Sequence, residues 1–213
     1  MWARRSSRSS TAPPGTLKIQ CETFRHFVSS YLTSRDALNF NGHEILIGME
    51  LGTAARFRTK FITLDVRDVG QIGELRNTLM SKHNGIDILV NNAAVYLQPS
   101  EDSDLFGVQT KTILETNYWG TRNIVTAFMP HFNPNCRIVN ITSNMAHHSA
   151  GPPEEVLLRK NLEDKFSRVS TIHELDGMLK AFQTDVLMGC WRENEWPSCA
   201  YSVSKMAINV YTR

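Results

Sequence analysis

Short apolar runs, each bounded by polar residues, recur along the chain. They are FVSSYLTSRD (27–36), KFITLDV (60–66), IDILVNNAA (86–94) and CRIVNITS (136–143). Runs of this length are typical of strands that are buried on both faces of a parallel sheet. We therefore expect four strands, and we expect the polar residues that end them to meet at one edge of the sheet.

Between these runs, apolar residues recur every three or four positions, which is the spacing of a helix. Asp68 is placed to cap one helix, and a longer helix is expected around residues 113–128. The apolar positions are Val69, Ile72, Leu75 and Leu79 in the first helix and Ile113, Gly120, Ile124 and Phe128 in the second. This alternation of strands and helices predicts an α/β fold with a doubly wound, Rossmann-like parallel sheet and right-handed crossovers.

A long segment at about 150–195 separates the last expected strand from the end of the chain. It contains PPEEVLLRKNLEDKF and STIHELDGMLKAFQTDVL, and the second stretch opens with Thr171-x-x-Glu174. That spacing is the signature of a capping box, so we expect a helical insertion here. The alternative is a surface excursion without a role of its own.

Residues 1–26 differ in composition from the rest. The stretch MWARRSSRSSTAPPG is rich in Ser, Arg and Pro, and the first acidic residue is Glu22. Such a composition buries too little apolar surface to order itself, so we expect a disordered or non-homologous segment before a domain at 27–213. An Arg- and Ser-rich leader without acidic residues is also compatible with a mitochondrial transit peptide, although no clear amphipathic stripe is present.

Composition limits the class of protein. The 213 residues suit one α/β domain, and 41% hydrophobic residues with a net charge of +2 give no reason to expect a nucleic-acid partner. No apolar run approaches the length of a membrane span. The cysteines and histidines lack metal-ligand spacing, so we expect no metal, reduced thiols and a cytoplasmic protein. They include Cys21, Cys136, Cys190 and Cys199, and His147, His148 and His173.

Candidate chemistry lies near the end of the chain, in CAYSVSKMAINVYTR (199–213). Tyr201 and Lys205 are four positions apart, so on a helix both side chains lie on one face. An ammonium beside a phenol favours the phenolate, so this tyrosine could exchange a proton near neutral pH. By itself such a spacing is common, because lysines often cover helix surfaces.

Four motifs in order make chance less plausible. NNAA (91–94), ETNYWGT (115–121), NITS (140–143) and YSVSK (201–205) together resemble the motifs of the short-chain dehydrogenase/reductase family. The likeness covers roughly residues 27–213 and is nearest to the monomeric, NADPH-dependent carbonyl reductases of that family. Ala94 departs from the usual glycine. The long segment before Tyr201 is similar to an insertion that blocks tetramer formation in that subgroup, which implies a monomer.

The resemblance implies roles for four residues in the reduction of a small-molecule carbonyl compound to an alcohol. Tyr201 would donate a proton to the carbonyl oxygen as hydride reaches the carbon. Lys205 would support the tyrosine and hold the nicotinamide ribose, and Ser143 would hydrogen-bond the substrate oxygen. Asn117 would anchor a water that leads from Lys205 to solvent.

The resemblance also implies a cofactor site at the strand ends. Arg35 is placed to accommodate the 2′-phosphate of NADPH, despite the adjacent Asp36. Asp65 would bond the adenine amine, and residues near it in space would line the cofactor cleft. The cofactor-binding residues expected are Arg35, Asp65, Val66, Asn92, Ala93, Tyr201 and Lys205.

Two expected parts of such a domain have no counterpart in the sequence. No glycine lies between Gly15 and Gly42, where a glycine-rich phosphate loop is expected, and strands that would follow Arg213 are missing. The chain thus looks truncated at both ends, and TLKIQ (16–20) could fill the slot of the first strand. The alternative to an active enzyme is an inactive, unstable fragment or isoform that at most binds another protein, because unpaired strand edges would be exposed.

Overall fold

The computed structural model describes residues 16–22, 43–50, 58–100, 102–147 and 153–213. The expected strand at 27–36, and with it Arg35, lies outside the described residues. The same holds for residues 1–15 of the N-terminal segment.

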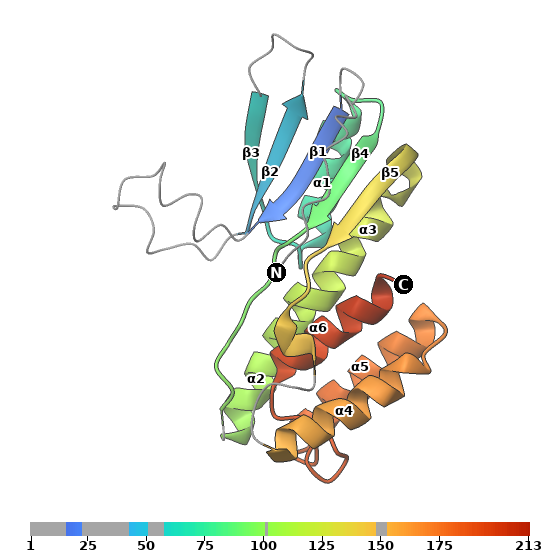
Figure 1. Ribbon diagram of the computed structural model, residues 1–213. Helices are drawn as coiled ribbons and strands as arrows, with labels where there is room; N and C mark the ends of the chain where they lie inside the picture. The colour runs from blue at the N-terminus through green and yellow to red at the C-terminus, as the bar shows by residue number, and fades with distance from the viewer. Residues whose placement is uncertain (1–15, 23–42, 51–57, 101, 148–152) are drawn as a thin grey trace, which may run out of the picture.

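A five-stranded sheet forms one end of the molecule (Figure 1). Its order is β3-β2-β1-β4-β5, with β1 at Thr16–Glu22, β2 at His43–Glu50, β3 at Arg58–Leu64, β4 at Ile86–Asn91 and β5 at Phe132–Asn140. Strands β1, β4 and β5 are parallel neighbours. The structure confirms an α/β, Rossmann-like fold.

The expectation of a wholly parallel sheet is wrong for one strand. Strand β2 runs antiparallel to both β1 and β3. The run at 43–50 was not expected to form a strand, but EILI carries the β-branched and apolar residues that suit one. Strand β1 lies between β2 and β4, so TLKIQ does fill the slot of the first strand, and the edge of β4 that faces it is paired rather than exposed.

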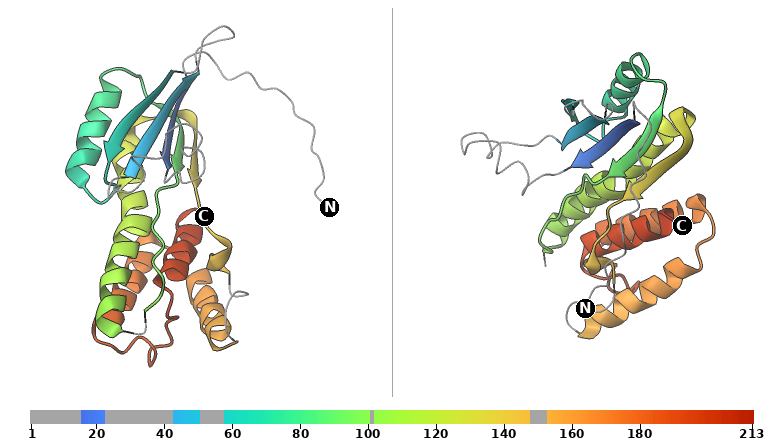
Figure 2. Two further views of the ribbon diagram at one scale, coloured as in Figure 1. Left: turned by 90° about the vertical axis from the view of Figure 1, so that its left-hand side faces the viewer. Right: turned by 45° about the horizontal axis from the view of Figure 1, so that its top comes forward.

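The helices extend from the sheet to the far end of the molecule. They are α1 at Val69–Met80, α2 at Ser103–Leu114, α3 at Thr121–Phe128, α4 at Pro153–Ser167, α5 at Ile172–Leu187 and α6 at Ala200–Tyr211, with short turns η2 at Glu115–Gly120, η3 at Met129–His131 and η4 at Asn144–Ala146. Helices α1 and α3 cover one face of the sheet, and α4, α5 and α6 gather beside α2 (Figure 2).

Local sequence explains where several helices begin. The carboxylate of Asp68 accepts hydrogen bonds from Gly70 N and Gln71 N, which confirms the expected cap of α1. At the start of α5, Glu174 N donates to Thr171 Oγ1, and Thr171 N donates to the carboxylate of Glu174. The capping box is therefore present, and both stretches expected to be helical, now α4 and α5, are helices.

The second expected helix is a continuous rod made of α2, η2 and α3, and its middle is a π-helix. Residues Glu115–Gly120 form the wider turn. Single π turns inside α-helices often occur at functional sites. Here the turn contains Asn117, which is 1% exposed.

Two hydrophobic cores pack against successive parts of this rod. One core joins the sheet to α1 and α3, with Leu89, Ile72 and Phe128 among its members. The other joins α2, α4, α5 and α6, with Phe106 and Phe182 among its members. The helices of the segment at 153–187 therefore belong to the same packing unit as α6.

Strand β5 begins and ends earlier than the sequence indicated. It spans Phe132–Asn140 rather than 136–143, and Asn135 within it has φ of 68°. A proline, Pro134, is tolerated because β5 is an edge strand of the described sheet. Ser143 consequently lies beyond the strand and caps the short turn η4.

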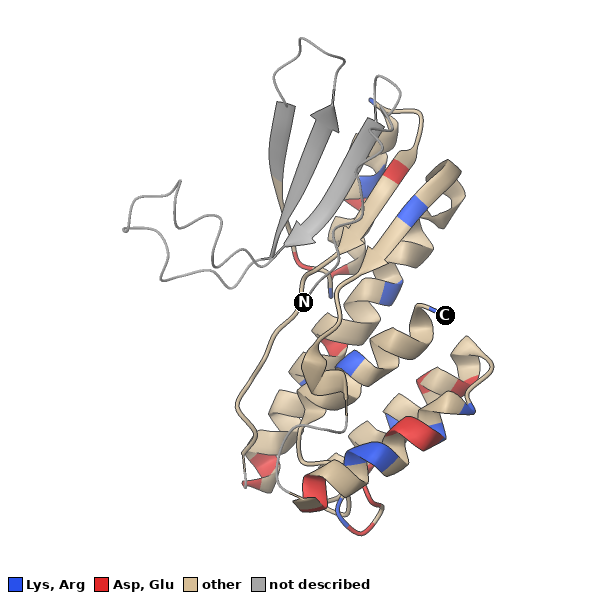
Figure 3. Cartoon of the chain, in the orientation of Figure 1, with Lys and Arg blue, Asp and Glu red and all other residues tan. Residues whose placement is uncertain are grey.

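In the described part of the chain, acidic and basic residues are interspersed on α4 and α5 (Figure 3). Cys136, Cys190 and Cys199 carry free thiols. Over the described ranges, no cluster of three metal-ligating side chains occurs. None of the described helices is both long and apolar enough to cross a bilayer.

Candidate active site

Helix α6 carries Tyr201 and Lys205 on one face, as their spacing indicated. The Nζ atom of Lys205 lies 5.7 Å from the centre of the Tyr201 ring. The same Nζ donates a hydrogen bond of 2.7 Å to the carbonyl oxygen of Ile141, just beyond β5. The ammonium is thus fixed between Tyr201 and the carboxyl edge of the sheet.

The environment of Lys205 changes its acid–base behaviour. The residue is 4% exposed. Burial disfavours the charged form and lowers the pKa of Lys205 from 10.5 to about 8. The side chain is therefore still mainly an ammonium at neutral pH, but it loses its charge under mildly alkaline conditions.

Ser143 lies close to α6 because η4, which it caps, packs against that helix. Its hydroxyl accepts from Met145 N at 3.2 Å and donates to Asn144 Oδ1 at 3.3 Å. A hydroxyl bond of 3.3 Å is longer than a good one, so this donor is easily exchanged for a better acceptor.

Asn117 has a different set of partners from those expected. Its Oδ1 accepts from Val95 N at 2.8 Å, and its Nδ2 donates to Val95 O and to Ser204 Oγ, both at 3.0 Å. Both ends of the side-chain amide are therefore used in holding protein groups. A water relay would have to use the backbone carbonyl of Asn117, which accepts from Thr121 Oγ1 at 2.9 Å.

Asp65 and Val66 follow β3 at the same edge of the sheet. The carboxylate of Asp65 accepts from the guanidinium of Arg67 through Nε at 3.0 Å and Nη2 at 2.7 Å. Val66 is buried, and a Cβ atom on Gly120 would lie 2.6 Å from its Cγ2. The absence of a side chain at Gly120 is what lets the π turn approach this strand end.

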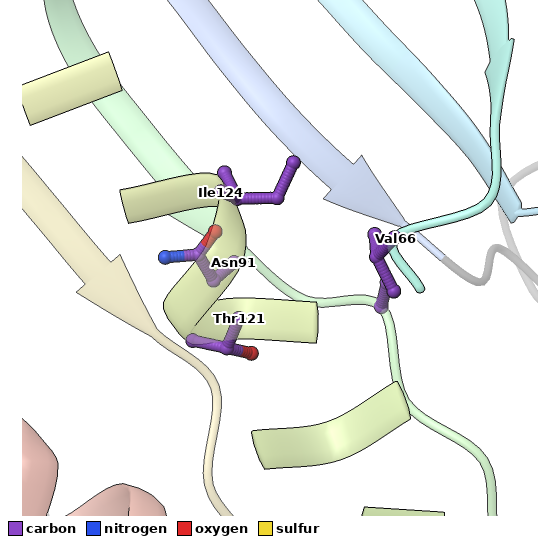
Figure 4. A pocket seen from close by; sticks show the side chains of 5 residues that line it. Val66, Asn91, Thr121 and Ile124 are labelled. Atoms are coloured by element: carbon purple, nitrogen blue, oxygen red, sulfur yellow. The ribbon is translucent and has the colours of Figure 1, made fainter. Parts of the chain in front are cut away.

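A small pocket lies between the strand ends and the start of α3 (Figure 4). Its lining residues are Val66, Asn91, Ala93, Thr121 and Ile124. Two of them, Val66 and Ala93, were expected to contact a cofactor, and Asn92 lies between two lining residues in sequence. Asn91 Nδ2 donates to Asn140 Oδ1 at 2.8 Å, whereas no described group donates to the buried Asn91 Oδ1.

Two residues near Tyr201 were not anticipated from the sequence. Ser204 is fully buried and donates to Tyr201 O at 2.7 Å while accepting from Asn117. Ser204 stands between Val203 and Lys205 in YSVSK, and that local pattern did not indicate a buried serine. Tyr96 places its ring 5.1 Å from that of Tyr201, nearly perpendicular at 87°. No local pattern marked Tyr96, because the contact joins distant segments.

Comparisons with known proteins relate the chain to a family. A family model described as short chain dehydrogenase matches residues 43–152. Carbonyl reductase (NADPH) 1 of Macaca fascicularis and of Homo sapiens are each 34% identical to the chain over 158 residues, covering 72% of this chain and 54% of the relative. The chain therefore spans about half the length of these curated relatives.

Another relative and a solved structure are also similar to parts of the chain. Carbonyl reductase (NADPH) 3 of Mus musculus is 34% identical over 156 residues, covering 72% of this chain and 54% of the relative. A short-chain dehydrogenase/reductase from Serratia marcescens has a TM-score of 0.39 at 23% identity, over 48% of each chain. On the strength of the family match across half its length, this chain belongs to the short-chain dehydrogenase family.

Proposed function

We propose that the protein is an oxidoreductase that reduces small-molecule ketones, aldehydes or quinones to alcohols with NADPH. The observation that carries the proposal is the placement of the Lys205 ammonium over the Tyr201 ring at the carboxyl edge of the sheet. In open α/β sheets this edge is where ligands bind. The names of the carbonyl reductase relatives support NADPH as the cofactor.

The described residues fit a nicotinamide dinucleotide at two points. An ammonium has three donors, and within the described ranges Lys205 Nζ makes one hydrogen bond, to Ile141 O. Two donors therefore remain for the hydroxyls of a ribose. The second point is at the strand ends, where the buried Asn91 Oδ1 is an acceptor without a described donor.

The remaining cofactor assignments are also part of the proposal. Val66, Asn92 and Ala93 would line the cleft, and Asp65 would meet the adenine amine while keeping Arg67 as its other partner. Arg35 would hold the 2′-phosphate through its planar guanidinium. NADPH, when bound, supplies the hydride.

In the proposed reaction, Tyr201 donates its phenolic proton to the carbonyl oxygen as the carbon is reduced. The phenolate that remains is stabilised by the neighbouring Lys205 ammonium, whose charge is retained below its pKa of about 8. Ser143 exchanges its long bond to Asn144 for one to the substrate oxygen. Asn117 holds the loop at Val95 through its side-chain amide, and its backbone carbonyl would anchor the water that leads from Lys205 to solvent.

Tyr201→Phe tests this mechanism. The variant keeps the ring but removes the transferable proton, so NADPH oxidation in the presence of a carbonyl compound should fall by about 10²- to 10⁴-fold. Tyr211→Phe, on the same helix, is the matched control and should retain the wild-type rate. Retention of the rate by Tyr201→Phe would show that another group supplies the proton.

The proton-transfer step also predicts how the rate depends on pH. Lys205 loses its charge as pH rises through about 8, so reduction should decline on the alkaline side of that value. An unchanged rate well above this pH would mean that the ammonium is not needed.

A second candidate function, a protein-binding segment without catalysis, is favoured by one observation. Residues 16–41 contain no glycine, although glycine lets backbone amides approach a pyrophosphate closely. Titration with NADPH, followed by quenching of tryptophan fluorescence, separates the candidates. Saturation at micromolar NADPH supports the oxidoreductase, and no quenching at millimolar NADPH supports the alternative.

A further inference from the structure

Tyr96 lies in the loop between β4 and α2, directly beside the proposed proton donor. Its ring is 5.1 Å from the Tyr201 ring and nearly perpendicular to it. Tyr96 is nevertheless 44% exposed, which is unusual for an aromatic side chain packed on another one. Part of the Tyr96 side chain is therefore open to solvent.

The backbone that carries Tyr96 is held firmly. The preceding residue, Val95, bonds through both its N–H and its carbonyl oxygen to the amide of Asn117. Asn117 in turn donates to Ser204, and Ser204 donates to the carbonyl oxygen of Tyr201. The two tyrosine rings are also in contact with each other. Tyr96 is therefore fixed relative to Tyr201 by both its backbone and its side chain.

Among the described residues, the polar atom of Tyr96 has one weak partner. Its hydroxyl donates to Gln98 Oε1 at 3.3 Å, which is long for a hydroxyl bond. The contribution of Tyr96 to the site is therefore that of a rigid aromatic surface. Aromatic rings favour perpendicular or offset contacts with other aromatic rings, beyond the gain from buried area.

We propose that Tyr96 is a specificity-determining residue that favours substrates whose carbonyl group is attached to a planar aromatic ring. A carbonyl oxygen that accepts the proton of Tyr201 brings its substituent next to the Tyr96 ring. An aromatic substituent gains an aromatic contact there, whereas a saturated ring of similar size gains only burial. This inference rests on the proposed function in taking Tyr201 as the group that meets the carbonyl oxygen.

Binding of two matched alcohols tests the proposal without requiring turnover. Benzyl alcohol and cyclohexylmethanol both carry a six-membered ring, and ligand-observed NMR gives their dissociation constants without cofactor. Replacing Tyr96 by leucine should reduce the preference for benzyl alcohol over cyclohexylmethanol by about 2- to 12-fold. Tyr96→Phe should keep the preference, and Leu97→Ala, a change at the neighbouring position, which is 36% exposed, should leave it as in the wild type.

Turnover of benzaldehyde and cyclohexanecarbaldehyde separates this inference from the proposed function. For Tyr96→Leu, KM for benzaldehyde should rise more than kcat falls, because a contact made equally in ground and transition states is lost. Turnover with an unchanged preference in Tyr96→Leu would refute the role of Tyr96 and leave the proposed function standing. A binding preference that depends on Tyr96 in a protein without turnover would support Tyr96 and refute the proposed reaction.

Discussion

Lys205→Met should change how the stability of the protein depends on pH. Methionine keeps the apolar stem of the lysine but removes the ammonium that burial makes costly. Lys205 is 4% exposed, and burial is the cause of its lowered pKa. The substitution therefore removes a titrating group whose pKa differs between the folded and the unfolded chain.

The sign follows from proton binding. The unfolded chain keeps a proton on Lys205 up to a pH near 10.5, whereas the folded chain releases it near 8. Between these values the unfolded state binds more protons, so the free energy of unfolding of the wild type rises with pH. Below pH 8 the full penalty of the buried charge is present, and above 10.5 it is gone.

The size of the effect follows from the shift. At about 1.4 kcal/mol per pKa unit, a fall from 10.5 to about 8 corresponds to about 3 kcal/mol in total. Between about pH 7.5 and 9.5, the free energy of unfolding of the wild type should gain about 2 kcal/mol relative to Lys205→Met. The offset between the two proteins at neutral pH also includes the loss of the donor to Ile141 O, so the slope is the quantity to compare.

The assay is urea unfolding at a series of pH values, followed by tryptophan fluorescence. Lys111→Met is the matched control, because the Lys111 side chain is 62% exposed and bridges Glu115 only at 3.9 Å. Its difference from the wild type should stay flat over the same range. A flat difference for Lys205→Met as well would refute the claim that burial lowers the pKa of this lysine.

Two further substitutions test the packing that positions the site. Gly120→Ala should lower the free energy of unfolding, because overpacking against Val66 costs about 1–3 kcal/mol, which is more than the helix propensity gained. Gly73→Ala has open space around its Cβ and should instead raise the free energy of unfolding. Equal effects of the two substitutions in urea unfolding would contradict this reasoning. Thr171→Ala removes the cap of α5 and should cost about 1 kcal/mol, whereas Thr112→Ala, at a partly exposed position within α2, should change little in the same assay.

Features that depend on neighbours in sequence were predictable. The cap at Asp68 and the capping box at Thr171 require only side chains within one helical turn, and both are present. The pairing of Tyr201 with Lys205 also depends on helical spacing alone, and the ring and ammonium do lie together. Such features follow from the sequence because the backbone geometry of a helix fixes the distance.

Features set by distant contacts were not predictable. The antiparallel direction of β2 depends on its pairing with β1 and β3, and periodicity carries no information on strand direction. The bonds of Asn117 to Val95 and Ser204 join residues 22 and 87 positions away. The roles of the site residues, and the position of Arg35, stay predictions.

The turn that holds Asn117 is itself anchored by a buried carboxylate from α5. The hydroxyl of Tyr118, the next residue, donates to Asp176 Oδ1 at 2.9 Å, and Arg122 donates to Asp176 Oδ2. Burial, and then the bond to Asp176, raises the pKa of Tyr118, so its hydroxyl remains a donor. A buried carboxylate is tolerated only while such donors meet it. The position of the π turn therefore depends on the packing of α5 against it. Through this turn, the segment at 153–187 also supports the hydrogen bonds of Asn117 to Val95, in the loop that carries Tyr96.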